Sequence, residues 1–207
     1  MRRLILQLDY DSDTDDPVEY SGWKFVSFNR RHRAFVHPDQ YFGKIGFTRK
    51  LQVGTAFVLS CYSHSGDRWS LYKEGMQCQF DTAQVAGLLI WTDPLKHFPK
   101  SLNERRDRAR GFLDVYNEWA NGSCYWYCLS RHISDDVEPE ELGSCGGFIG
   151  DDDLWSALKS EHFRADDYVR VEGDAKDLAK YADLSPAVLV DDFSETPAND
   201  MSECVVI

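Results

Sequence analysis

One segment restricts the fold more than any other: a helix that stops at a glycine and is followed at once by an aromatic run. Residues 101–122, SLNERRDRARGFLDVYNEWANG, start with Ser101 and carry Glu104 three residues later, which is the pattern of a capping box. Apolar side chains then recur at three- and four-residue steps, as in a helix that packs one face on a core. Gly122 fits the left-handed residue that ends many helices. The sequence therefore predicts an amphipathic helix over 101–121.

The aromatic run after this helix, SCYWYCLSRHI at 123–133, is predicted to be a strand, because Tyr and Trp favour strands over helices. In a strand, Cys124 and Cys128 would stand about 13 Å apart, too far to bind one zinc ion or to form a disulfide. The six cysteines are therefore expected to be free thiols. The opening residues lack the apolar stretch of a secretory leader, and no apolar run is long enough to span a bilayer, so we expect a cytoplasmic protein without membrane contact.

The remaining elements are shorter. Strands are predicted at 3–8, 23–29, 54–66, 69–75 and 168–172, and a second, shorter helix at 151–161. Two stretches are predicted as mixed structure: a helical turn and then a strand at 81–93, and an acidic loop and then a glycine-rich turn at 134–150. The fold class is therefore α+β, with an antiparallel sheet of about five strands, the long helix packed on one face and a second short helix. We expect one domain over 1–190 and an acidic, flexible tail at 191–207.

Charge is distributed unevenly along the chain. Residues 1–110 contain 17 Lys and Arg against 13 Asp and Glu, whereas residues 111–207 contain 6 against 22, and the whole chain has a formal net charge of −12. Direct binding of nucleic acid is not expected, because contacts to phosphate need clustered Lys and Arg. Acidic halves of this kind occur as binding surfaces for basic partners and also as solvated surfaces with loose tails.

The acids that could form a binding surface gather around the predicted second helix and the loop before it. Carboxylates held on a rigid surface can imitate backbone phosphates and occupy a basic groove. The candidate partner-binding residues are Asp135, Asp136, Glu138, Glu140, Glu141, Asp151, Asp152 and Asp153.

A second candidate site is the loop SHSGDRWS at 63–70, which combines His64, Asp67, Arg68 and Trp69. His and Asp can transfer protons, and Arg can bind a carboxylate or phosphate with two hydrogen bonds. The same residues also suit a plain turn between two strands, with Trp69 in the core.

Two further stretches suggest metal or anion binding and fail on inspection. The acidic run DYDSDTDD at 9–16 lacks the glycine and glutamate of an EF-hand loop in either register. The glycines of GSCGGFIGDD at 143–152 could bind an anion in front of a helix. However, the aspartates at the start of that helix repel phosphate. Tight backbone packing is the alternative explanation for the glycines. No metal and no cofactor are expected.

Four motifs taken together resemble a group of small uncharacterised proteins encoded by bacteriophages and mobile elements. They are Ser65-Gly66-Asp67-Arg68-Trp69, then Tyr116-Asn117-x-Trp119-x-x-Gly122, then Tyr125-x-Tyr127, and Cys145-Gly146-Gly147-Phe148-x-Gly150. The resemblance covers about residues 55–155. This chain departs from the group where Gly122-Ser123-Cys124-Tyr125 replaces the usual Gly-Asp-Val-Tyr. The resemblance implies a phage or plasmid accessory protein in bacterial cytoplasm, and it carries over no catalytic residue.

The leading hypothesis is a non-enzymatic binding protein whose acidic surface inhibits a basic host protein, one that acts in defence or handles nucleic acid. One alternative is an enzyme or small-ligand-binding protein centred on the 63–69 loop. Another is a minor virion component.

Overall fold

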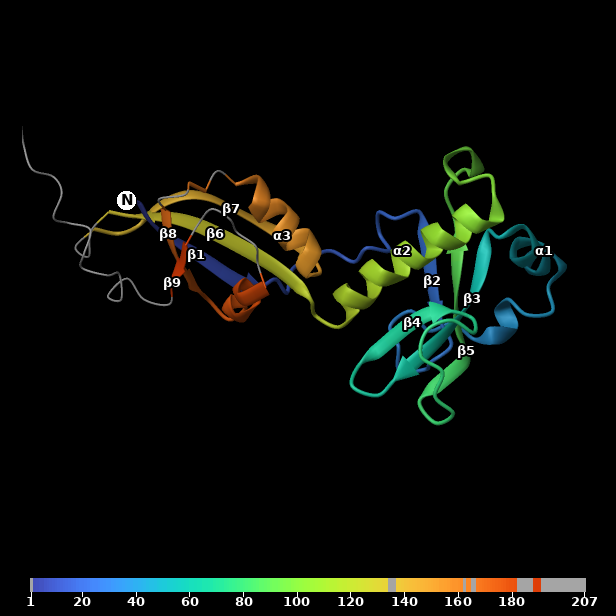
Figure 1. Cartoon of the computed structure of the whole chain (residues 1–207). Helices are drawn as coiled ribbons and strands as arrows, with labels where there is room; N and C mark the ends of the chain where they lie inside the picture. Colours follow the sequence, from blue (N-terminus) through green and yellow to red (C-terminus); the bar gives the residue numbers. More distant parts are fainter. Residues whose placement is uncertain (1, 134–136, 162, 165–166, 182–187, 191–207) are drawn as a thin grey trace, which may run out of the picture. The chain divides into compact units, whose positions relative to one another are not determined.

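The computed structural model describes residues 2–133, 137–161, 163–164, 167–181 and 188–190. Its contacts divide the chain into two compact units, each with its own sheet (Figure 1). Unit 1 comprises Met1–Thr14 and Cys124–Ile207, and unit 2 comprises Asp15–Ser123. Unit 2 is therefore an insertion between two consecutive segments of unit 1.

Unit 2 is built on a four-stranded antiparallel sheet in the order β2-β5-β3-β4. Its strands are β2 (Trp23–Ser27), β3 (Ala56–Ser63), β4 (Asp67–Leu71) and β5 (Thr82–Trp91). Its helices are η1 (Pro38–Gln40), α1 (Ile45–Val53), η2 (Leu95–His97) and α2 (Leu102–Ala120). Figure 1 shows α2 running across this sheet.

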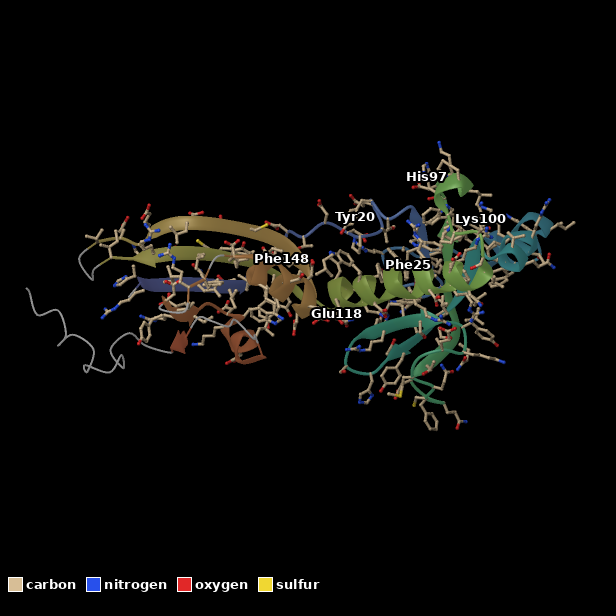
Figure 2. All side chains as sticks on the ribbon, turned by 45° about the horizontal axis from the view of Figure 1, so that its top comes forward. Tyr20, Phe25, His97, Lys100, Glu118 and Phe148 are labelled. Atoms are coloured by element: carbon tan, nitrogen blue, oxygen red, sulfur yellow. The ribbon has the colours of Figure 1, made fainter. Side chains whose placement is uncertain are left out.

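The main core of unit 2 lies between α2 and the sheet and is mostly aromatic. Phe25, labelled in Figure 2, stacks on Tyr116 with ring centres 4.3 Å apart and meets Trp69 edge to face at 4.8 Å. A second cluster on the other face contains Phe47 of α1. Because both faces of β5 are covered, its apolar residues run together as LLIW and do not alternate with polar ones.

Unit 1 contains a mixed sheet in the order β7-β6-β1-β8-β9. Its strands are β1 (Arg2–Tyr10), β6 (Cys124–His132), β7 (Glu140–Ile149), β8 (Asp167–Glu172) and β9 (Val188–Val190). Strand β1 pairs antiparallel with β6 and parallel with β8. Helix α3 (Asp151–Ser160) buries Leu154, Trp155 and Leu158 in the same core as the leucines of β1, and η3 (Lys176–Tyr181) follows β8.

The α+β class and the long helix are confirmed. Ser101 and Glu104 form both hydrogen bonds of the capping box, and Gly122 has a φ of +82° directly after the helix. The prediction of a single antiparallel sheet of about five strands is wrong: there are two sheets, and one is mixed. The pattern of one strand does not say which strand it pairs with, and β1 pairs with β6, far along the chain.

Two local predictions are also wrong. Residues 82–91 are strand throughout, without the predicted helical turn. The Thr82 hydroxyl accepts from Cys78 N–H and donates to Met76 O in the turn before β5. Residues 140–149 are a strand, not a loop and turn. Their side chains are exposed as far as Gly147, so no apolar alternation marks them as a strand.

The single domain expected over 1–190 stays a prediction, because the contacts separate two units without testing whether they fold together. The predicted acidic tail at 191–207 lies outside the described residues. Within the described part of the chain, no helix combines the length and the apolar character needed to cross a membrane.

Candidate functional site

The motifs at 65–69 and 116–122 form one interlocked structure in unit 2, where α2 meets the edge strand β4. The Asn117 side chain accepts a hydrogen bond from Trp69 N–H at 2.7 Å and donates one to Trp69 O at 2.9 Å. Strand β4 has a sheet neighbour on one side only, so an amide side chain stands where the next strand would be. This pairing gives the motif a structural role.

Asn121, one helical turn further on, extends the same contact. Its amide nitrogen donates to Asp67 O at 3.0 Å and to Asn117 O at 2.7 Å. A Cβ at position 66 would collide with the Asn121 side chain, so glycine at 66 allows the turn to lie against the helix. The motifs at 65–69 and 116–122 are therefore in contact, although about 50 residues separate them in the sequence.

His32 lies beside this junction, in the loop after β2. Its Nδ1 accepts from Ala34 N–H at 3.1 Å, which leaves the proton of the neutral ring on Nε2, 3.3 Å from the Tyr116 hydroxyl. Burial lowers the pKa of His32, and the neighbouring Arg33 lowers it further, whereas the carboxylates of Asp67 and Asp16 act in the opposite direction. Neutral His32 therefore fits the core, and protonation at Nδ1 would break the bond to Ala34.

This geometry predicts a pH dependence of stability. The folded-state pKa of His32 lies below the unfolded value of 6.5, so below that pH the unfolded chain binds more protons and the free energy of unfolding falls. We expect His32→Gln to flatten the loss of stability between pH 7.5 and pH 5.5 in urea unfolding. His97→Gln, at an exposed histidine whose side chain has no ion pair among the described residues, is the control and should leave the slope as in the wild type. Equal slopes in the two variants would contradict the assignment.

The four residues predicted as a ligand site do not converge on one point. Trp69 is 3% exposed and packs in the α2-side core, as expected of a structural residue. By strand alternation Asp67 shares its face, whereas Arg68 points to the opposite face and is exposed. His64 lies in the turn, with Nδ1 3.5 Å from Asp81 Oδ2. Trp69 alone among the four lines a common site, and Asp67 is connected to that site through its hydrogen bond with Ser63.

That site is a pocket of about 220 Å³ in unit 2, lined by Trp69, Cys61, Ser63, Asn29 and others. The pocket lies where the pairing of β3 with β5 shifts: Leu59 pairs with Gly87, but Cys61 pairs with Ala83. Bulges of this kind redirect side chains and occur next to binding sites.

A chain of polar groups runs along the rim of the pocket. Ser63 Oγ donates to Asp67 Oδ1 at 2.5 Å, and Cys61 Sγ lies 3.5 Å from Ser63 Oγ. Burial raises the pKa of the Cys61 thiol to about 11, so the thiol is protonated at neutral pH and donates to Ser63. A protonated thiol is a poor nucleophile, so the arrangement suits binding better than covalent catalysis.

Several acids of the 9–16 run accept hydrogen bonds from the backbone. Asp9 accepts from Asp174 N–H at 2.6 Å, and Asp16 accepts from Val18 N–H at 2.9 Å and pairs with Arg33. Among the described residues, no group of His, Cys, Asp or Glu side chains is arranged to hold a metal ion.

The glycine-rich stretch of β7 is a bulge that Asp11 caps. Between the pairs Tyr125–Phe148 and Tyr127–Cys145, Trp126 of β6 has no paired residue in β7, and Gly147 has a φ of +81° there. Asp11 Oδ2 accepts from Gly147 N–H at 2.8 Å. Gly147 is favoured by its left-handed φ, and a Cβ at Gly146 would lie 2.9 Å from Asp11 Oδ2, whereas nothing lies within 4 Å of a Cβ at Gly143.

The predicted acidic residues fall into two groups at the two ends of β7. Glu138, Glu140 and Glu141 lie at its start, and Asp151, Asp152 and Asp153 follow its end, about 30 Å away at the rise of a strand. Asp135 and Asp136 lie outside the described residues. We call the two groups, together with the outer edge of β7 between them, which pairs with no other described strand, the acidic strip.

Three acids of the acidic strip have local partners. Glu140 pairs with Arg131 at 3.1 Å, Glu141 accepts from Ser144 Oγ at 2.8 Å, and Asp153 accepts from Ile149 N–H at 3.3 Å. Within the residues that the structure describes, Glu138, Asp151 and Asp152 have neither a hydrogen bond nor an ion pair, and all three are exposed.

No protein family, curated protein or solved structure matches the chain.

Sequence reasoning identified Asn117 only as part of a motif and Ser63 only as part of the 63–70 loop, and it assigned no role to these two residues, to Asn121 or to His32. A signal for Asn117 and Asn121 exists, because two asparagines one turn apart beside an apolar helix face indicate side-chain contacts to a neighbouring backbone. His32 and Ser63 carry no such signal, since a loop in one case and a strand shift in the other bring them to the site.

Proposed function

We propose that the protein acts by binding, with the acidic strip of unit 1 occupying a basic, phosphate-binding surface of a partner protein. The observation that carries this proposal is the geometry of the strip. Within the described part of the chain, carboxylates without a hydrogen bond or ion pair flank an edge of β7 that pairs with no other strand and is about 30 Å long. Within the stretch between the two acidic groups, Gly143 to Gly147 are small and exposed, so they leave this part of the edge accessible.

The charge of the two units supports the same reading. Unit 1 has 23 Asp and Glu against 8 Lys and Arg, whereas unit 2 has 12 against 15. The excess of negative charge therefore belongs to the unit that carries the strip. A field of one sign attracts an oppositely charged partner over a distance and raises the rate of encounter.

The class of partner follows from the chemistry and from the resemblance to phage proteins. Two groups of carboxylates at the ends of an extended edge can imitate the phosphates at two places along a nucleic acid strand. A host protein that handles nucleic acid or defends the cell against it has the complementary basic surface. Inhibition would follow because the strip occupies the surface where nucleic acid binds.

The test removes charge from the strip without removing its local contacts. The variant combines Glu138→Gln, Glu141→Gln, Asp151→Asn and Asp152→Asn, and spares Asp153 and Glu140, which have structural partners. Glutamine at 141 keeps an oxygen that can accept from Ser144 Oγ. We expect wild-type protein to retain a basic host protein from bacterial lysate at about 0.05 M salt and to release it at about 0.5 M, where charges are screened. Duplex DNA should displace the retained protein, and the variant should not retain it.

The matched control removes four charges from unit 2 with Asp39→Asn, Asp93→Asn, Asp114→Asn and Glu118→Gln; Glu118 is labelled on α2 in Figure 2. This control should retain the partner as the wild type does. Retention that is insensitive to salt, or equal for both variants, would refute the proposal. Recovery of the protein in purified phage particles would instead favour a virion component.

A further inference from the structure

The pocket beside the β3–β5 shift has the size and chemistry of a small-molecule site. At about 220 Å³ it is smaller than the roughly 300–1,000 Å³ of sites for drug-sized molecules, which limits an occupant to one or two rings. Two of its walls, Phe28 and Trp69, are aromatic, and Ala83 and Ala86 leave space between them.

The polar groups of the pocket define what an occupant must offer. Asn29 Oδ1 is taken by Arg31 N–H at 3.0 Å, so the Asn29 amide nitrogen is the donor toward an occupant. The Ser63 hydroxyl proton is taken by Asp67, so Ser63 Oγ is an acceptor. No charged side chain lines the pocket, and the Cys61 thiol is neutral, which disfavours a charged occupant.

We propose that this pocket binds a neutral, planar nitrogen heterocycle with one N–H donor and one ring acceptor, the chemistry of a nucleobase-sized ring. The donor pairs with Ser63 Oγ, the acceptor pairs with the Asn29 amide, and the ring lies against Trp69. This inference concerns unit 2 alone and does not depend on the acidic strip.

Three probes of nearly the same shape test each contact at pH 7.5. Benzimidazole has both the donor and the acceptor, indole has the donor only, and 1-methylbenzimidazole has the acceptor only. Binding is measured by NMR titration of the full chain to about 10 mM probe, the range in which fragment-sized ligands saturate. We expect benzimidazole to shift the Trp69 indole and Ala83 methyl signals and to bind roughly three- to tenfold more tightly than either relative, the effect of one hydrogen bond.

Variants link the binding to this pocket. Ala83 is exposed, so the larger side chain of Ala83→Leu can fill the pocket without disturbing the packing of the core. This variant should no longer bind benzimidazole in a saturable way. Asn29→Asp keeps the acceptor for Arg31 N–H and removes the amide donor, so it should weaken benzimidazole and leave indole unchanged. Ser63→Ala should weaken benzimidazole and leave 1-methylbenzimidazole unchanged.

The control is Ala120→Leu, the same change at an exposed position of α2 outside the pocket, which should bind as the wild type does. Absence of saturable shifts with benzimidazole in the wild type would overturn the proposal. So would equal binding by Ala83→Leu and Ala120→Leu, or equal affinity for all three probes.

Discussion

Asn117→Ala is expected to lower the free energy of unfolding by about 2–4 kcal/mol, because it leaves both the N–H and the C=O of Trp69 without a partner. The backbone of Trp69 lies at the edge of the sheet against α2, where water does not readily replace the lost bonds. Asn117→Asp retains the acceptor and loses the donor, so an intermediate loss is expected. The measurement is urea unfolding followed by tryptophan fluorescence, to which unit 2 contributes four of the six tryptophans.

The control for this prediction is Asn103→Ala, in the exposed first turn of the same helix. Alanine there improves helix propensity slightly and removes no tertiary contact, so stability should be equal to the wild type or a little higher. If Asn117→Ala and Asn103→Ala lie within about 0.5 kcal/mol of each other, the bond pair does not stabilise the junction.

Gly87→Ala is expected to destabilise unit 2 by about 3 kcal/mol, because its Cβ would collide with the carbonyl oxygen of Val26. That oxygen belongs to the backbone of β2, so relief requires β2 to move away from β5 at the pair Ser27–Gly87. The same Cβ would lie 3.2 Å from the Trp69 ring, so the ring leaves no room for relief on that side. Thermal and urea unfolding should both show the loss.

Gly111→Ala is the matched control, since nothing lies within 4 Å of a Cβ at that exposed helical position. It should raise stability by about 0.5–1 kcal/mol through helix propensity. A stable Gly87→Ala protein with wild-type unfolding would mean that the β2–β5 pair is looser than its register indicates.

The long helix shows what could be predicted from local sequence. Its start, its buried face and its end at Gly122 depend on residues within a few positions of one another, and each prediction is confirmed. Most strands follow for the same reason, since β-branched and aromatic runs favour extended backbone wherever they lie. The placement of Trp69 in the core was one of two readings that the sequence left open.

The sheets show what local sequence could not decide. Strand β1 pairs with β6 across the whole of unit 2, and no pattern within either strand names its partner. Strand β7 was predicted as a loop because its glycines and acids face solvent, and only the hydrogen bonds to β6 make it a strand. The charge asymmetry was evident from the sequence, but its assignment to one compact unit was not.

For the candidate sites, too, some features could be predicted from the sequence and others depend on the tertiary structure. The sequence by itself determined the residue types: which acids occur between 135 and 153, which loop combines histidine, aspartate, arginine and tryptophan, and which helix carries two asparagines one turn apart. Only the tertiary structure decided their use. Strand alternation turned Arg68 away from Asp67, a shift in strand pairing opened the pocket beside Trp69, and the length of β7 separated the acids into two groups. Each of these outcomes depends on contacts between residues distant in the chain, and local spacing carries no information about them.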